Sequence, residues 1–216
     1  MEQTVLTYIQ KKAIAFIGKE SNFKDFYLSG GTALAAYYLK HRLSDDLDFF
    51  NYDNPDAVFL HDFAERLKIE INATSVRFER LYDRNIFFFK INEEELKIEF
   101  SKYPFIQLEA TTVKNDIKID SLRDIATNKL MALLDRFDPK DFVDMFFLLK
   151  EFNIENIRCD VEKKFGIKVD DIFLGGELSK VKRIEALPKM IKQTTIKELK
   201  DFFSDLARGL SSKIFE

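Results

Sequence analysis

Residues 27–50 read YLSGGTALAAYYLKHRLSDDLDFF, and this stretch decides the fold that we predict for the chain. A short apolar segment that ends at Gly30-Gly31, followed by apolar residues at helical spacing, indicates a strand, a tight turn and a helix. A second apolar segment then carries Asp46 and Asp48. Because alternate side chains of a strand share a face, these two carboxylates are expected on one face, about 7 Å apart.

The turn and the two carboxylates together suit the binding of a nucleotide. Backbone N–H groups at the start of a helix attract a phosphate, and glycine lets it approach closely, while Ser29 and Thr32 add hydroxyl donors. Two carboxylates beside such a turn supply the hard oxygen ligands that magnesium on a nucleotide triphosphate requires. Residues 43–62 hold six acidic residues and no Lys or Arg, and this crowding favours a bound cation.

Each of these signals also has a plain structural interpretation. A Gly-Gly turn before a helix is most often only a turn, and an Asp-x-Asp pair is most often solvated surface. Their order along the chain makes the nucleotide-binding interpretation more specific than either part alone. Asp45 is expected to point to the opposite side from Asp46 and Asp48, so it is left out of the site.

Outward from this stretch, the hydrophobic pattern predicts an α/β half over residues 1–120 and a helical half over residues 121–216. The second half is broken at Asp138-Pro139. A helix is also expected to begin after Asn54-Pro55, with Asn54 as its cap. The remaining expected elements are helices at 3–18 and 32–40 and strands at 25–29, 45–51, 74–82, 85–91, 95–101 and 108–119, the last broken near Asn115.

The composition narrows the class of protein. The 34 basic residues nearly balance 37 acidic ones, so the net charge of −3 gives no whole-chain signature of nucleic-acid binding. The single cysteine, Cys159, excludes an internal disulfide and a cysteine-rich zinc site. The N-terminus is amphipathic rather than signal-like, and no apolar run has membrane-spanning length. We therefore expect a cytoplasmic protein with no membrane partner.

The segments GGTAL at 30–34 and HRLSDDLDFF at 41–50 carry a resemblance to known families. An apolar-Gly-Gly turn, a helix and Asp-x-Asp resemble the signature of the polymerase beta-like nucleotidyltransferases. The fuller pattern more narrowly resembles the AbiEii family, which includes toxin components of bacterial toxin–antitoxin and phage-abortive systems. The resemblance implies an α/β core with a mixed or antiparallel sheet, a helical lobe that completes the cleft, and NTP with Mg²⁺ bound by Asp46 and Asp48.

In that superfamily a third catalytic acid comes from a neighbouring strand, and Glu99 is the expected residue here. Family members often carry Asp at this point. The alternatives are a site with two carboxylates only, or an exposed Glu99 on an edge strand. The residues of the glycine turn and of the segment before the aspartates are expected to bind the nucleotide: Ser29, Gly30, Gly31, Thr32, Arg42 and Ser44. Arg42 could instead lock the acidic strand through an ion pair.

The helical half supplies further expected site residues. Lys129 and Arg136 are seven residues apart and share one helix face. The string of Lys129, Arg136, Lys140-Asp141 and Asp144 resembles AbiEii members, and by that resemblance Lys129 would contact the triphosphate and Asp141 would complete the catalytic site. Lys129 is also expected to be catalytic, and Arg136 to bind the nucleotide. Without the resemblance, the sequence favours Asp141 as a helix cap and Lys129 as a solvated charge. His41 and His61 are expected to be structural or surface residues.

These patterns predict an enzyme that moves an NMP group from an NTP to an acceptor. The acceptor is expected to be RNA, and the 3′ end of a tRNA is one candidate. The resemblance also implies possible toxicity and a cognate antitoxin. The alternatives are a protein AMP- or UMP-transferase and a non-catalytic nucleotide-binding partner module. Residues 180–216 hold nine basic and five acidic residues, which would form either an RNA-facing surface or an ordinary solvated one.

Overall fold

The computed structural model describes residues 4–212, with side chains to 210. The chain forms two compact units. The sheet unit comprises the residues up to Tyr38, Ser44–Ile106 and Ala110–Ser121, and the helical unit comprises Leu39–Leu43, Gln107–Glu109 and the residues from Leu122 on. Two short segments from the first 120 residues therefore belong to the helical unit.

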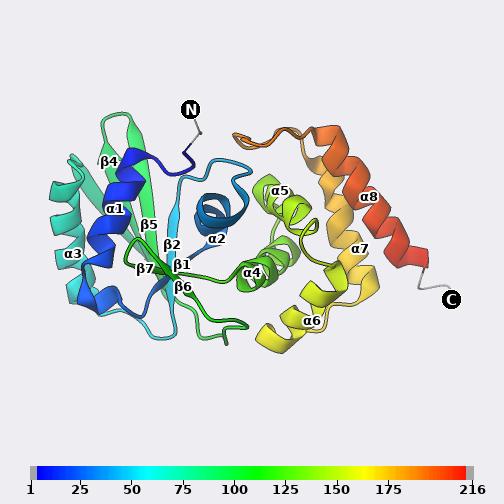
Figure 1. The fold of residues 1–216 in the computed structure, drawn as a ribbon, viewed down its shortest axis with the longest axis horizontal. Coiled ribbons are helices and arrows are strands. Elements are labelled where there is room, and N and C mark those ends of the chain that lie inside the picture. Colours follow the sequence, from blue (N-terminus) through cyan, green and yellow to red (C-terminus); the bar gives the residue numbers. More distant parts are fainter. Residues whose placement is uncertain (1–3, 213–216) are drawn as a thin grey trace. The chain divides into compact units, whose positions relative to one another are not determined.

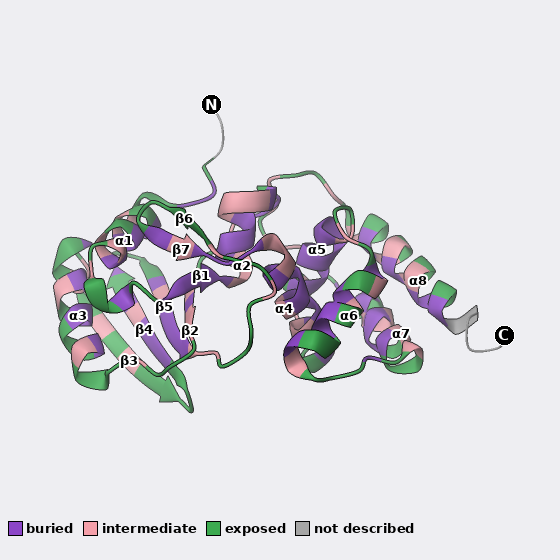
Figure 2. Cartoon of the chain, turned by 60° about the horizontal axis from the view of Figure 1, so that its bottom comes forward, coloured by how far each residue is buried: buried purple, intermediate pink, exposed green. Residues whose placement is uncertain are grey.

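The sheet unit is built on a seven-stranded mixed sheet in the order β3-β4-β5-β2-β1-β7-β6 (Figure 1; β3 is labelled in Figure 2). The pairs β1·β7 and β2·β5 are parallel, and the other neighbours are antiparallel. This confirms the predicted mixed α/β class. The strands are β1 (Tyr27–Ser29), β2 (Leu47–Asn51), β3 (Ser75–Leu81), β4 (Arg84–Ile91), β5 (Glu94–Lys102), β6 (Thr112–Lys114) and β7 (Ile117–Ile119).

Phenylalanine fills the space between the sheet and its helices. Phe100 of β5 is fully buried, stacks on Phe23 with ring centroids 4.5 Å apart, and meets Phe63 of α3 (Ala57–Glu70) edge-on. α1 (Tyr8–Gly18) packs beside α3, and Phe16 lies 5.7 Å from Phe63. Burial of each such ring stabilises the fold by about 1.5–3 kcal/mol. Because side chains alternate along a strand, Asp48 of β2 and Lys97, Glu99 and Ser101 of β5 lie on the opposite face of the sheet.

Several predicted boundaries of the sheet unit were wrong. The helix expected at 3–18 begins at Tyr8, where Thr7 and Gln10 form a capping box, and residue 3 lies outside the described residues. The helix expected at 32–40 is α2 (Gly30–Ala33) followed by a π-helical segment (Leu34–Leu39). Asp56, rather than Asn54, caps α3, because its carboxylate accepts from the N–H of Phe59 at 2.7 Å.

The last predicted strand is two short ones. β6 and β7 are joined by Asn115 and Asp116, which both have positive φ, so the predicted break is confirmed and residues 108–111 are not strand. The strands predicted at 74–82, 85–91 and 95–101 are confirmed to within a residue.

The helical unit contains α4 (Leu122–Asp135), α5 (Pro139–Leu148), α6 (Ile154–Phe165), α7 (Asp171–Ser179) and α8 (Ile196–Ser212). The break at Asp138-Pro139 is confirmed, since Asp138 caps α5 and Pro139 occupies its first position. α5 is buried along most of its length, as the purple ribbon in Figure 2 shows, and it packs against α4 and α8. No helix among residues 4–212 is long and apolar enough to cross a membrane.

Candidate active site

The glycine turn of the sheet unit holds an aspartate against its backbone. β1 ends at Ser29, which pairs with Asp48 of the antiparallel strand β2, and the chain then turns at Gly30 with φ +67°. A Cβ atom at position 30 would lie 2.6 Å from Oδ2 of Asp48. Only glycine allows both the left-handed conformation and this close approach. The carboxylate of Asp48 is therefore packed directly against the turn.

The two hydroxyls of the turn make contacts within the sheet unit. Ser29 Oγ donates to Oδ2 of Asp120 at 2.7 Å, and Thr32 Oγ1 donates to the backbone carbonyl of Asp46. Ser44 accepts a bond from the side chain of Gln10 through its own carbonyl oxygen, at 2.9 Å. These bonds fix the ends of the loop that joins the turn to the aspartates. The predicted nucleotide contacts of Ser29, Gly30, Gly31, Thr32 and Ser44 remain predictions.

Asp46 differs from its predicted setting, because β2 begins at Leu47 and Asp46 lies just before the strand. It is nevertheless brought to the same group as Asp48. Oδ2 of Asp46 lies 3.2 Å from Nζ of Lys97, and the negative charge of Asp48 also acts on that ammonium. The Asp46 side chain is 44% exposed. The two aspartates thus share one cationic neighbour.

Glu99 is brought to the aspartates by strand register. β5 runs parallel to β2, and Glu99 lies directly opposite Asp48. The alternative of an exposed edge-strand residue is wrong, since Glu99 is 3% exposed and β5 lies inside the sheet. Its carboxylate accepts two bonds of 2.6 Å from Arg84 and one of 2.6 Å from Ser101 Oγ. Burial raises the pKa of Glu99, but these bonds and the charge of Arg84 outweigh burial and lower it, which keeps the group ionised.

Lys97 is a basic residue of this site that the sequence reasoning missed. Its Nζ atom lies 3.2 Å from Asp46 and 3.7 Å from Glu99. Partial burial lowers the pKa of Lys97, but the charges of Asp48, Asp46 and Glu99 outweigh burial and raise it. The alternation Lys97-Ile98-Glu99 on a strand was the available signal, because it places Lys97 on the same face as Glu99.

The donor set of the sheet unit fits a magnesium–nucleotide complex. Mg²⁺ is usually held by one or two carboxylates together with substrate phosphates, rather than by a complete protein cage. Asp46 and Asp48 supply such a pair, and within residues 4–212 no group of three or more His, Cys, Asp or Glu side chains is arranged to hold a metal ion. In this arrangement Glu99 is a partner of Arg84, and its catalytic role remains a prediction.

The predicted residues of the helical unit form a buried ion network centred on Asp144, which is fully buried. Arg42 donates to its two oxygens at 2.6 and 2.8 Å, His41 Nε2 lies 2.7 Å away, and Lys129 Nζ lies 2.6 Å away. Arg42 therefore pairs with Asp144, and the alternative in which it locks the acidic strand through an ion pair is wrong. Arg42 is 2% exposed, and its contacts favour a role in holding Asp144; its nucleotide contact remains a prediction.

Asp141 links this network to a more exposed arginine. Its carboxylate lies 2.9 Å from Nζ of Lys129 and 3.0 Å from Nε of Arg136, whose side chain is 58% exposed. The predicted common face of Lys129 and Arg136 is thus confirmed. The alternative of Asp141 as a helix cap is wrong, because Asp138 caps α5. The alternative of Lys129 as a solvated charge is also wrong, because Lys129 is 8% exposed.

Charge and burial set the protonation states of the network. Burial raises the pKa of Asp144, but Lys129, Arg42 and His41 outweigh burial and hold it well below its usual range. Burial lowers the pKa of His41, and the bond to Asp144 offsets this only in part. Nδ1 of His41 is buried and has no hydrogen-bond partner among the described residues. A neutral ring that donates from Nε2 to Asp144 fits both observations.

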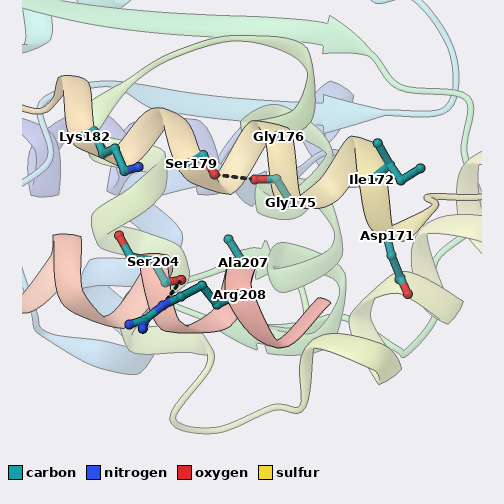
Figure 3. Close-up of a pocket in the computed structure, with 9 residues that line it drawn as sticks. All are labelled: Asp171, Ile172, Gly175, Gly176, Ser179, Lys182, Ser204, Ala207 and Arg208. Atoms are coloured by element: carbon teal, nitrogen blue, oxygen red, sulfur yellow. Dashed lines mark hydrogen bonds between the residues drawn. The ribbon is translucent and has the colours of Figure 1, made fainter. Parts of the chain in front are cut away.

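A separate cavity of 440 Å³ lies in the helical unit between α7 and α8 (Figure 3). It is lined by small residues such as Gly175, Gly176 and Ala207, and Ser179 Oγ donates to the Gly175 carbonyl at 2.7 Å. None of the predicted site residues lines this cavity, and we assign it no function.

The basic excess of the C-terminal region is partly neutralised locally. Lys197 and Arg208 pair with acids one helical turn away, Asp201 and Asp205. Lys180 similarly pairs with Glu177. These pairs support the interpretation of an ordinary solvated face, and an RNA-facing surface remains a prediction.

Solved structures share this fold. A candidate nucleotidyltransferase from H. pylori is 19% identical, with a TM-score of 0.65 over 99% of this chain and 96% of that one. JHP933 from Helicobacter pylori is 20% identical, with a TM-score of 0.61 over 95% and 90%. The nucleotidyltransferase toxin MenT4 from Mycobacterium tuberculosis H37Rv is 12% identical, with a TM-score of 0.54 over 94% and 81%. The fold is thus the one found in nucleotidyltransferases.

The sequence narrows this class to one family. The model of the family described as nucleotidyl transferase AbiEii toxin, Type IV TA system, matches residues 15–215, and the chain belongs to that family. An uncharacterized protein of Aquifex aeolicus (strain VF5) is 33% identical over 161 residues, which are 72% of this chain and 74% of the relative. The protein is accordingly a nucleotidyltransferase, and the predicted resemblance is confirmed.

Proposed function

We propose that this protein transfers an NMP group from an NTP to an RNA acceptor, such as the 3′ end of a tRNA, with Mg²⁺ bound by Asp46 and Asp48. One observation carries this proposal: the carboxylate of Asp48, a hard oxygen ligand, is packed against the backbone of the Gly30 turn. A metal-bound triphosphate presents the complementary groups, namely a cation and phosphate oxygens.

Each part of the sheet unit has a role in this reaction. Asp46 and Asp48 hold the metal, which would neutralise the triphosphate and activate the attacking hydroxyl. The N–H groups of the turn at Gly30-Gly31 bind a phosphate, and Ser29 and Thr32 keep the loop in place through their bonds to Asp120 and Asp46. Glu99 holds Arg84 and thereby limits the excess negative charge beside the aspartates.

The helical unit supplies the remaining roles, and the family pattern is the basis for assigning them. Lys129 and Arg136 bind the phosphates of the nucleotide, and Asp141 keeps both side chains in position through its two oxygens. Asp144, with Arg42 and His41, fixes Lys129 from the buried side. Phosphoryl transfer depends mainly on positioning and charge neutralisation, which a rigid set of charged side chains provides.

The family also supports a biological setting. As an AbiEii-type protein, the chain would act in the cytoplasm as a toxin, restrained by a cognate antitoxin. Modification of RNA in the translation apparatus would account for toxicity. Induced expression of the parent protein should then arrest growth, whereas a variant with Asn at positions 46 and 48 should be tolerated.

The acceptor class can be tested directly. The parent protein is incubated with Mg²⁺, an NTP labelled at its α-phosphate, and total bacterial RNA and protein. If ribonuclease removes the label and protease does not, the acceptor is RNA. Label with the opposite sensitivity would show that the acceptor is a protein, and nucleotide binding with neither labelled product nor pyrophosphate would favour a non-catalytic binding module.

A further inference from the structure

The ammonium group of Lys97 lies where three carboxylates of the sheet unit converge. Nζ is 3.2 Å from Asp46 and 3.7 Å from Glu99, and Asp48 lies directly opposite Glu99 on the paired strand β2. The side chain reaches this position from β5, whose register places Lys97 on the same sheet face as Glu99. The proposed metal ligands therefore already share a cation that belongs to the protein.

The two cations near these carboxylates are held differently. Arg84 is bound to Glu99 by two bonds of 2.6 Å, and Glu99 is almost fully buried and also bonded to Ser101. A bidentate guanidinium pair of this kind is geometrically fixed. Lys97 instead makes one contact with each of two carboxylates, at 3.2 Å from Asp46 and 3.7 Å from Glu99. A flexible four-carbon stem with a compact charge can change partner at low cost.

An ammonium group and a divalent cation cannot both occupy the space beside Asp46 and Asp48 without strong repulsion. Displaced from the aspartates, the charge of Lys97 would keep only Glu99, a carboxylate that Arg84 already neutralises. The phosphates of a nucleotide are another anionic partner, and they arrive together with the metal as one complex.

We propose that Lys97 serves as the counter-ion of Asp46 and Asp48 in the nucleotide-free protein and transfers its ammonium group to the phosphates when the metal–NTP complex binds. Lys97 thereby makes the site bind metal and nucleotide together and disfavours free metal. The inference rests on the proposed function, because it takes Asp46 and Asp48 as the metal ligands. It assigns Lys97 as a nucleotide-binding and positioning residue.

The test measures the affinity of the protein for Mn²⁺ by electron paramagnetic resonance, with and without a non-hydrolysable NTP analogue. The variants are Lys97→Met and the matched control Lys90→Met, which removes an exposed lysine from the neighbouring strand, opposite Glu95. The parent and the control should bind Mn²⁺ weakly alone and at least roughly tenfold more tightly with the analogue. Lys97→Met should bind Mn²⁺ alone about tenfold more tightly than the parent, and should lose most of the gain from the analogue.

A Lys97→Met protein that is folded but binds Mn²⁺ alone as weakly as the parent would overturn the inference. Lys97→Arg provides a second variant if the methionine variant does not fold. It keeps a cation beside the aspartates, so it should retain the weak binding of free Mn²⁺, and tight binding would contradict the proposal. The double variant Asp46→Asn/Asp48→Asn separates a failure of the proposed metal site from a failure of the role proposed for Lys97. If that variant still binds Mn²⁺ with the analogue, the proposed metal site itself is wrong, whatever Lys97 does.

Discussion

The carboxylate of Asp48 occupies the space that a side chain at Gly30 would need, because a Cβ atom at position 30 would lie 2.6 Å from Oδ2 of Asp48. Gly30 also has φ +67°, a conformation that disfavours other residues. The turn and the carboxylate are therefore one structural element, joined by the pairing of Ser29 with Asp48. A change on either side of this contact should affect metal binding and nucleotide transfer.

Gly30→Ala tests this contact. The added methyl group should push the Asp48 carboxylate away from the turn and reduce the transfer rate by about 100-fold, as expected for misplacement of a catalytic group by about 1 Å. The left-handed backbone should cost about 1 kcal/mol of stability in addition. Gly166→Ala is the matched control, because Gly166 has φ +71° but no atom within 4 Å of a built Cβ. The control should show the stability loss with full activity; equal activity of both variants would contradict the role of the contact.

The proposed nucleotide-binding role of Arg136 predicts a loss of substrate affinity with little effect on folding. Arg136 is 58% exposed, so its pair with Asp141 should add less than about 1 kcal/mol to stability. Arg136→Met should raise KM for the NTP about tenfold, because a charge-assisted contact to phosphate is lost. Steady-state kinetics and urea unfolding measure the two quantities. Lys140→Met, at an exposed position nearby on α5, is the control, and an unchanged KM in Arg136→Met would remove Arg136 from the site.

Asp144 is expected to be essential for the helical unit. Asp144→Asn would leave the buried charges of Arg42 and Lys129 without their main counter-charge, and should lower the free energy of unfolding by about 3–5 kcal/mol. Denaturant unfolding followed by circular dichroism gives the value. Asp201→Asn, which breaks the exposed pair with Lys197, should produce no measurable change. A small effect at position 144 would mean that the network is not a stabilising element.

The stability of the helical unit should fall in mildly acidic solution because of His41. Burial lowers the pKa of His41 in the folded protein, so below about pH 6.5 the unfolded chain binds a proton that the folded protein does not. The unfolded state is favoured as pH decreases through that value. Asp144 acts in the same direction but only below about pH 4, because its folded pKa is depressed below its unfolded value.

Unfolding measured between about pH 5 and pH 7 isolates the contribution of His41. His41→Gln should flatten the dependence in that range. His61→Gln, at an exposed position, should leave the dependence as it is in the parent protein. If the slope persists in His41→Gln, another group is responsible for it.

The fold class followed from local sequence patterns. The glycine turn, the Asp-x-Asp pair and the alternation over residues 74–101 depend on neighbours in the sequence, and these signals located β1, α2 and the three antiparallel strands. Element ends were less predictable. Asp46 lies outside β2 because the loop before the strand is fixed by Thr32 and Gln10, whose bonds to its carbonyls come from other elements.

The partners of buried charges were not visible in the sequence. Nothing in the segment around Arg42 indicates that it pairs with Asp144, a residue 102 positions away. Lys97 was missed for a similar reason, since its closeness to Asp46 follows from the parallel register of β2 and β5. Such contacts depend on which strands become neighbours, and a single sequence contains little information about that.

The most direct test of the account is a comparison of two labels in one reaction. The parent protein is given RNA, Mg²⁺ and each NTP in turn, labelled either at the α-phosphate or at the γ-phosphate, with Asp46→Ala/Asp48→Ala as the control. The account predicts that α-label enters the RNA, that γ-label leaves as pyrophosphate, and that the control does neither. Entry of the γ-label into the product, or transfer by the control at the parent rate, would contradict nucleotidyl transfer at Asp46 and Asp48.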